Sequence, residues 1–133
     1  RGRCLHNHIT TATRETALSR FKALKAGENF HDLSPELKTT YSNAERTQNT
    51  IYMRLKYDEP SGTVVNVRKS MWIHPELDRA ISIREAARLQ TFPDSFIFEG
   101  TKDSQYQQVG NAVPPFLAKA VAESIISILD QIQ

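Results

Sequence analysis

The first part of the chain alternates apolar and polar positions with a helical period. Over residues 13–25, Ala17, Phe21 and Leu24 recur on one face, and Gly27 follows as a stop signal. The pattern predicts an amphipathic helix that ends shortly before this glycine.

A second, shorter helix is expected at Pro35. Ser34 is a favourable cap residue, and proline is well tolerated at the first helical position because that position needs no donated hydrogen bond. Residues 38–50 are polar and rich in Thr, Asn and Ser, which is typical of a loop.

The middle of the chain changes to a period of two. Residues 51–57 alternate apolar and polar side chains, and residues 63–67 are short and β-branched. A turn at residues 60–62 separates them, so the pattern predicts two strands of a small β region.

The last third returns to helical patterns. Ser82 and Glu85 have the spacing of a capping box, which predicts a helix through about Gln90, and Pro93 prevents its extension. We expect a loop from there to Gly110.

A long helix should start at residues 114–115, which are both proline. Its apolar face is wide, so we expect it to pack against something large. The stripe consists of Leu117, Val121, Ile125, Ile128 and Ile132.

Charge is unevenly distributed over the 133 residues. Residues 1–70 carry twelve Lys/Arg and seven Asp/Glu, whereas residues 71–133 carry five and eight. A basic first half suits a polyanion such as DNA, and a solvated basic surface is the alternative. The single cysteine, Cys4, allows no internal disulfide, which fits a reducing cytosol. There is no apolar run near the roughly 20 residues of a membrane span, and the absence of an initiator Met suggests a piece of a longer protein.

Two motifs, in order, carry a family resemblance. Residues 79–94, RAISIREAARLQTFPD, resemble the ninth conserved motif of DNA cytosine-5 methyltransferases. Residues 105–115, QYQQVGNAVPP, resemble the tenth, whose core is Gly-Asn-x-Val-Pro. More weakly, residues 54–64 are similar to the end of the family's target-recognition region. Together the motifs identify the chain as the C-terminal portion of such an enzyme.

The resemblance implies a cofactor site. In the family the tenth motif contacts S-adenosylmethionine, which assigns this role to Asn111, Ala112 and Val113, and less firmly to Tyr106. Gly110 would let the backbone approach the ligand closely, and Asn111 offers both a donor and an acceptor. The alternative is a simple turn before a helix.

A DNA-contacting set is expected around the two predicted strands. Cationic side chains position a phosphate backbone, and arginine can recognise guanine through two hydrogen bonds. A solvated strand edge is the alternative. The predicted set is Arg54, Lys56, Thr63, Asn66, Arg68 and Lys69.

The helix of the ninth motif has a different expected role. Arg79, Arg84, Glu85 and Arg88 should form an ion-pair network that holds the DNA-contacting region in place, rather than touch DNA. Phe92 and Trp72 are expected in the core.

The catalytic signatures of the family are missing. Its nucleophile lies in a Pro-Cys loop and its base-binding residue in Glu-Asn-Val, but Cys4 follows Arg3 and Glu28-Asn29 precedes Phe30. We therefore assign no catalytic residue. His6 and His8 are consecutive with Asn7 and do not have the spacing of a nuclease metal site, so no metal is expected.

These inferences combine into one expectation. The fold should be a mixed α/β (α+β) fragment, with a partial target-recognition region at 1–78 and the conserved motifs and terminal helix at 79–133. The complete enzyme would methylate C5 of cytosine in duplex DNA within a bacterial restriction-modification system, in the cytosol or nucleoid, whereas this piece alone would be inactive. Its partners would be duplex DNA and the N-terminal catalytic domain, whose cofactor-binding sheet the last helix would cover. The isolated piece could dimerise through that helix. No membrane partner is expected. A non-enzymatic DNA-binding module, or the recognition subunit of a split methyltransferase, is the alternative.

Overall fold

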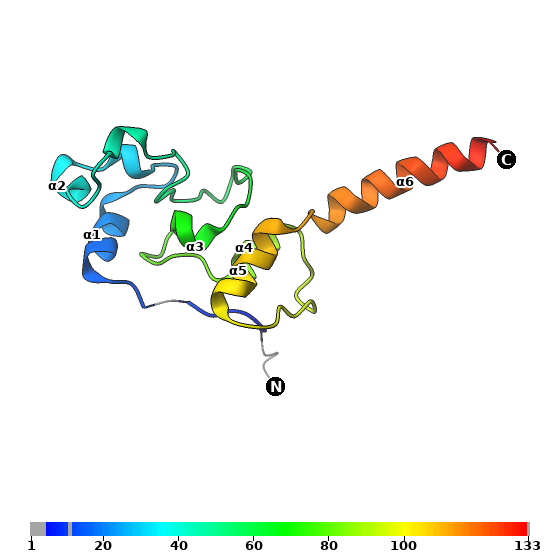
Figure 1. Ribbon diagram of the computed structural model, residues 1–133, viewed down its shortest axis with the longest axis horizontal. Helices are drawn as coiled ribbons and strands as arrows, with labels where there is room; N and C mark the ends of the chain where they lie inside the picture. The colour runs from blue at the N-terminus through cyan, green and yellow to red at the C-terminus, as the bar shows by residue number, and fades with distance from the viewer. Residues whose placement is uncertain (1–4, 11, 133) are drawn as a thin grey trace.

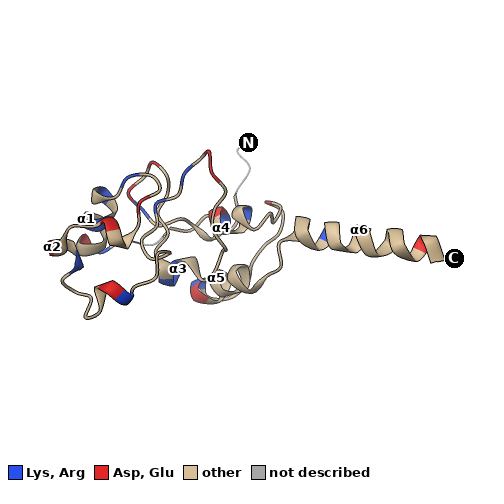
Figure 2. Cartoon of the chain, turned by 90° about the horizontal axis from the view of Figure 1, so that it is seen from above, with Lys and Arg blue, Asp and Glu red and all other residues tan. Residues whose placement is uncertain are grey.

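A computed structural model describes residues 5–10 and 12–132 as a folded body from which one long helix projects (Figure 1). The body ends at residue 111, and the projecting helix carries few charged side chains (Figure 2). In chain order the elements are α1 Glu15–Ala23, η1 Phe30–Asp32, α2 Pro35–Lys38, η2 Ala44–Arg46, α3 Val67–Ser70, α4 Ile83–Leu89, α5 Lys102–Asn111 and α6 Pro115–Ile132.

Two buried clusters hold the body together. The first, which we call the N-terminal core, includes Phe21 of α1 and the aromatic rings of Phe30 and Tyr52. The second, the central core, joins α3, α4 and α5 around Trp72 and Val109. Burying aromatic and aliphatic side chains of this size stabilises each cluster by roughly 1.5–3 kcal/mol per residue.

Three helices of the body that the sequence predicts, α1, α2 and α4, are confirmed. The first is shorter than predicted and buries Ala17 and Phe21. In α4 the Ser82 hydroxyl accepts from the backbone N–H of Glu85, and the Glu85 carboxylate accepts from the N–H of Ser82 at 2.7 Å. This is the predicted capping box, which satisfies two N–H groups that the helix itself cannot.

The two predicted strands are wrong, so the mixed α/β expectation holds only in part. Among residues 5–10 and 12–132 there are isolated bridges but no strand, and the body is mostly helical. Tyr52 adopts a left-handed φ of 53°, which interrupts the extended backbone of residues 51–57. Asn66 caps α3 by accepting from the N–H of Lys69, so the second segment ends in a helix.

The loop expected up to Gly110 is also wrong, because it contains α5. Thr101 caps this helix through the backbone N–H of Ser104. Only Gln105, Tyr106 and Val109 of α5 are buried. Because so few of its positions are buried, the sequence of α5 shows no stripe of apolar residues at helical spacing.

The start of the chain is tied to α4 through Arg84, a fully buried arginine. Its guanidinium donates to the carbonyls of His6, Pro93 and Phe96, and to Oδ1 of Asn7. The bonds to His6 and Asn7 cross the proposed boundary between 1–78 and 79–133, and that division remains a prediction.

The last helix, α6, begins at Pro115 as predicted, and none of its eighteen described residues is buried. Its attachment runs through Thr91, whose hydroxyl accepts from the N–H of Phe116 at 3.1 Å. By length and composition alone, the helical stretch Lys102–Ile132, which ends in α6, is long and apolar enough to cross a membrane. Core helices that pack on a large partner pass the same test.

Candidate nucleic-acid interface

Arg54 faces the interior. It is 5% exposed, and its guanidinium donates to the carbonyls of Phe21 and Leu24 and pairs with Asp78 at 2.6 Å. These bonds tie α1 to the segment before α4. Because its donors are engaged internally, we leave Arg54 out of the proposed DNA-contacting set.

Lys56 and Thr63 lie apart from the rest of the predicted set. Lys56 pairs with Glu59 at 2.7 Å, and it lines small depressions beside Leu89. The hydrogen bond that Lys56 donates to the Glu59 carboxylate raises the pKa of Lys56. Thr63 is exposed in the segment before α3. Their predicted contact with DNA stays a prediction.

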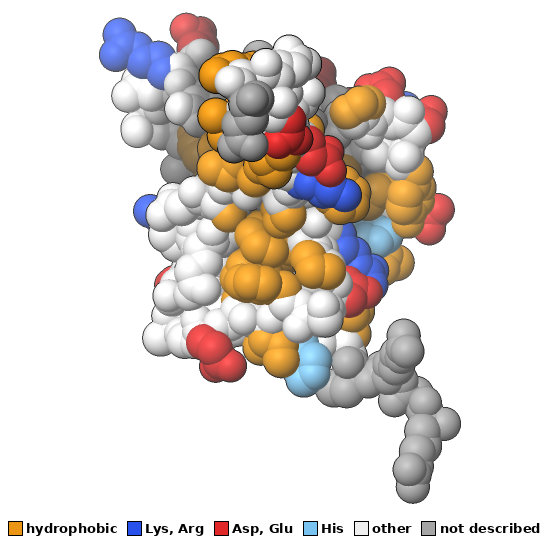
Figure 3. Space-filling model, turned by 90° about the vertical axis from the view of Figure 1, so that its right-hand side faces the viewer, with side chains coloured by type: hydrophobic (Ala, Val, Ile, Leu, Met, Phe, Trp, Pro, Cys, Tyr) orange, Lys and Arg blue, Asp and Glu red, His pale blue; other side chains and the backbone are white. Residues whose placement is uncertain are grey.

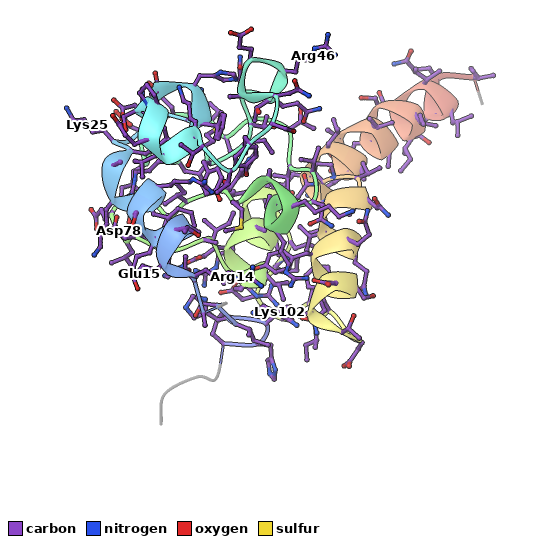
Figure 4. All side chains as sticks on the ribbon, turned by 60° about the vertical axis from the view of Figure 1, so that its left-hand side comes forward. Arg14, Glu15, Lys25, Arg46, Asp78 and Lys102 are labelled. Atoms are coloured by element: carbon purple, nitrogen blue, oxygen red, sulfur yellow. The ribbon has the colours of Figure 1, made fainter. Side chains whose placement is uncertain are left out.

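The other three predicted residues, all at α3, line one groove. Asn66, Arg68 and Lys69 meet Arg14, which precedes α1, around a groove of about 890 Å³. Arg14 and Lys102 lie at the starts of α1 and α5, toward the same end of the body (Figure 4). The sequence prediction missed Arg14, although its place at the start of an amphipathic helix in the basic half was a usable signal.

Cationic side chains outnumber anionic ones in the groove lining, which contains Arg14, Arg20, Arg68 and Lys69 but only Asp103 as an acid. Arg68 pairs with Asp103, and both side chains are substantially exposed. Burial, with the nearby charge of Arg68, lowers the pKa of Lys102. Its ammonium donates to the Thr10 carbonyl at 3.0 Å. Because Arg68 and Lys102 repel each other, an anion such as a phosphate is favoured close to both.

Three of the four predicted cofactor residues lie together, where α5 ends and α6 begins. Asn111 and Val113 are exposed, and the carbonyl of Ala112 accepts from the side chain of Gln90. Tyr106 is elsewhere, buried in the central core, and its hydroxyl donates to the carbonyl of Ile81. Burial and the negative charge of Glu85 raise the pKa of Tyr106 to about 12, so its hydroxyl remains protonated.

Gly110 serves packing within the body. A Cβ added there would lie 2.8 Å from the backbone carbon and oxygen of Val65 and 3.1 Å from the nitrogen of Asn66. The absence of a side chain therefore lets α5 pack directly on the backbone that leads into α3. The sequence analysis expected Gly110 to let the backbone approach a ligand; in the structure the close neighbour is the backbone of Val65 and Asn66.

An apolar surface continues from the predicted cofactor residues onto α6. Val113 is 63% exposed and Phe116 71% exposed. Seen from the side on which α6 projects, hydrophobic side chains gather across the middle of this face (Figure 3). We call this the junction surface; its members on α6 are Phe116, Leu117, Val121, Ile125, Ile126, Ile128, Leu129 and Ile132.

The expected ion pairs of the ninth motif form in separate places. Arg79 binds both carboxylate oxygens of Glu85, at 2.8 and 2.7 Å, and Arg88 pairs with Asp94 at the surface. Burial acts to raise the pKa of Glu85, but hydrogen bonds from Arg79 and the Ser82 N–H outweigh it and lower the pKa to about 2. The four residues therefore do not form the single network that was predicted, and Arg84 binds carbonyls instead of a carboxylate. That the motif does not touch DNA stays a prediction.

The described part of the chain contains no cluster of three or more His, Cys, Asp or Glu side chains that could hold a metal ion. His8 Nδ1 lies 2.9 Å from the Ser82 hydroxyl, and the backbone carbonyl of His6 accepts from Arg84. Cys4, which we assigned no role, lies outside the described residues.

Comparison with known proteins assigns a relationship to most of the chain. The model of a family described as C-5 cytosine-specific DNA methylase matches residues 3–127. Type II methyltransferase M.DdeI of Desulfomicrobium norvegicum is 37% identical over 92% of this chain and 32% of its own length. M.AgeI of Thalassovita gelatinovora is 51% identical over 56% of this chain and 18% of its own. Type II methyltransferase M.AquIB of Picosynechococcus is 37% identical over 96% of this chain and 94% of its own length. The chain thus spans about a third of M.DdeI and nearly all of M.AquIB.

Proposed function

We propose that this chain, which belongs to the C-5 cytosine-specific DNA methylase family, supplies the DNA-contacting groove and the last cofactor-contacting segment of a DNA cytosine-5 methyltransferase. The complete enzyme would transfer a methyl group from S-adenosylmethionine to C5 of cytosine in duplex DNA. The proposal rests above all on the family match over residues 3–127. It applies to a type II restriction-modification setting, because the relatives are type II methyltransferases.

Three side chains carry the proposed contact with DNA. Arg14, Arg68 and Lys69 line the same groove from α1 and α3, and each can meet a phosphate oxygen. Asn66 lies in the same groove, with its amide bonded to the N–H of Lys69 and to Gln107. Affinity should fall with salt, because every neutralised phosphate releases counterions.

The cofactor contact is proposed for Asn111, Ala112 and Val113. Asn111 is exposed and carries a donor and an acceptor, which suits a polar ligand, and Val113 offers apolar contact. S-adenosylmethionine, when bound, supplies the methyl group. These residues would bind and orient it, whereas the nucleophile comes from another part of the enzyme.

That other part is the occupant that we propose for the junction surface. The match leaves about two thirds of M.DdeI uncovered, which is ample chain for a catalytic part. The junction surface is continuous with the proposed cofactor residues, so a partner that covers α6 would also approach the cofactor. An apolar surface of this extent is unusual on a soluble monomer.

A methyl-transfer assay tests the proposal. The chain is combined with the polypeptide segment encoded with it that carries the Pro-Cys and Glu-Asn-Val signatures, and transfer from labelled S-adenosylmethionine to duplex DNA is measured. We expect transfer by the pair and none by either piece alone. No transfer when both pieces are folded and associated would refute the proposal.

A second arrangement has an observation in its favour. M.AquIB has almost the same length as this chain, so a polypeptide of this extent occurs in a relative. The chain would then act as a recognition subunit that meets a separately encoded catalytic part. A stop codon and a new start upstream of Arg1 would support this arrangement; an uninterrupted reading frame would favour the single-chain enzyme.

A further inference from the structure

A short ladder of amide side chains joins the groove to the proposed cofactor segment. Nδ2 of Asn66 donates to Oε1 of Gln107 at 3.0 Å. Nε2 of Gln107 in turn donates to Oδ1 of Asn111 at 2.7 Å. Gln107 is therefore bonded at once to a residue of the DNA side and to a residue of the cofactor side.

The groove end of this ladder is fixed by the backbone. Asn66 uses Oδ1 to cap α3, accepting from the N–H of Lys69 at 3.3 Å, so only its Nδ2 is free to bond Gln107. The tight packing of Gly110 on Val65 and Asn66 holds α5 against this cap. The distance that Gln107 spans is thus set by the fold.

The other end of the ladder determines how Asn111 presents its amide. Because Gln107 donates to Oδ1, the donor group Nδ2 of Asn111 remains to face a ligand. A freely rotating amide would present donor and acceptor with similar frequency. Holding one orientation removes an entropy cost from binding a ligand acceptor such as a carboxylate.

We propose that Gln107 is a positioning residue, which orients the Asn111 amide for the cofactor and links that orientation to Asn66 in the groove. The inference rests on the proposed function, in which Asn111 contacts S-adenosylmethionine. A consequence is that Asn66, although it lies on the DNA side, influences cofactor affinity. By linkage, a ligand that occupies one side alters affinity on the other by the same factor.

The test uses the complete enzyme and measures S-adenosylmethionine and duplex binding separately, with the melting temperature as a check of folding. Gln107→Leu removes both bonds at nearly constant size. We expect the Kd for S-adenosylmethionine to rise about threefold to tenfold, since one or two exposed hydrogen bonds are lost, while the melting temperature stays within about 2 °C. The matched control is Gln108→Leu, on the same helix as Gln107. It loses the bonds that Gln108 donates to Glu99 and Ser104 but leaves the ladder intact. It should leave the cofactor Kd within about twofold.

A double-mutant cycle separates the ladder from a local effect. Asn66→Ala should raise the cofactor Kd severalfold when Gln107 is present, and should add little in the Gln107→Leu background. Lys69→Ala, also on α3 but outside the ladder, should weaken DNA binding alone.

The outcomes distinguish failure of the amide ladder from failure of the proposed function. Additive effects of Asn66→Ala and Gln107→Leu, or an unchanged cofactor Kd in Gln107→Leu, would overturn the ladder while the wild type still methylates DNA. A wild-type enzyme that binds no S-adenosylmethionine would instead refute the proposed function itself.

Discussion

The helices α5 and α6 are neighbours in sequence and opposites in packing. The polar α5 buries three of its ten residues and is clamped to α3 and α4. The apolar α6 buries none of its eighteen described residues. Burial within the chain therefore does not follow hydrophobicity here. An apolar helix without a partner on its own chain indicates that a separate surface supplies the missing contacts.

This difference divides the molecule into a body that is packed internally and a helix, α6, none of whose described residues is buried. Substitutions in the body should change unfolding of the isolated chain. Substitutions in α6 should change association instead.

The strongest effect is expected at Arg84. Arg84→Ala leaves the carbonyls of His6, Pro93 and Phe96 without this donor and opens a cavity beneath α4. We expect a loss of about 3–5 kcal/mol in the free energy of unfolding, measured by urea denaturation. Arg88→Ala is the matched control, because its ion pair with Asp94 is half exposed, and it should cost less than about 1 kcal/mol. Similar losses in both variants would contradict the role assigned to Arg84.

Gly110 tests the contact between α5 and the segment before α3. Gly110→Ala forces a methyl group to within 2.8 Å of the Val65 backbone, which should cost about 1–3 kcal/mol. Gly62→Ala, where no atom lies within 4 Å, is the control and should be nearly neutral. If Gly110→Ala instead raised the melting temperature, the close packing of α5 on this segment would be wrong.

Acid should weaken the body through Glu85. Its pKa falls from 4.5 to about 2 on folding, so its contribution is complete above pH 4.5 and is lost as the pH drops toward 2. The contribution is of the order of 2 kcal/mol after allowing for partial exposure. Urea denaturation at pH 6 and pH 3 should give a larger drop for wild type than for Glu85→Gln. Equal drops would assign the acid sensitivity to other carboxylates.

The smallest effect on the isolated chain is expected in α6. Ile125 is 53% exposed, so Ile125→Asp should leave the melting temperature of the body within about 2 °C. A clear fall in melting temperature would mean that α6 folds back onto the body or pairs with a second copy. Ser124→Asp is a control for added charge at a neighbouring polar position.

The same contrast explains what the sequence could and could not predict. The capping box of α4 and the start of α6 depend on local residues, so Ser82, Glu85 and the prolines were sufficient. The strands failed because Tyr52 takes a left-handed conformation and because Arg54, polar in the alternation, is buried by bonds to distant carbonyls. Neither feature leaves a local signal.

The sequence likewise predicted part of the candidate site and missed part of it. The tenth motif placed Asn111, Ala112 and Val113 together, whereas Asn66, Arg68 and Lys69 were predicted only as part of a wider set that the structure divides. Arg14 and Gln107 were missed because their roles depend on segments brought together by folding. Arg54 was included because charge alone does not distinguish an exposed cation from one whose donors are engaged inside the fold.

Docking of the junction surface on the catalytic part is tested most directly by measuring binding between this chain and the catalytic part encoded with it. Sedimentation velocity measures this binding. Wild type should form a one-to-one complex, and Ile125→Asp should weaken it by at least tenfold while Ser124→Asp does not. Equal binding by wild type and Ile125→Asp, or insertion of α6 into lipid vesicles in preference to binding the catalytic part, would contradict the claim that the junction surface docks the rest of the methyltransferase.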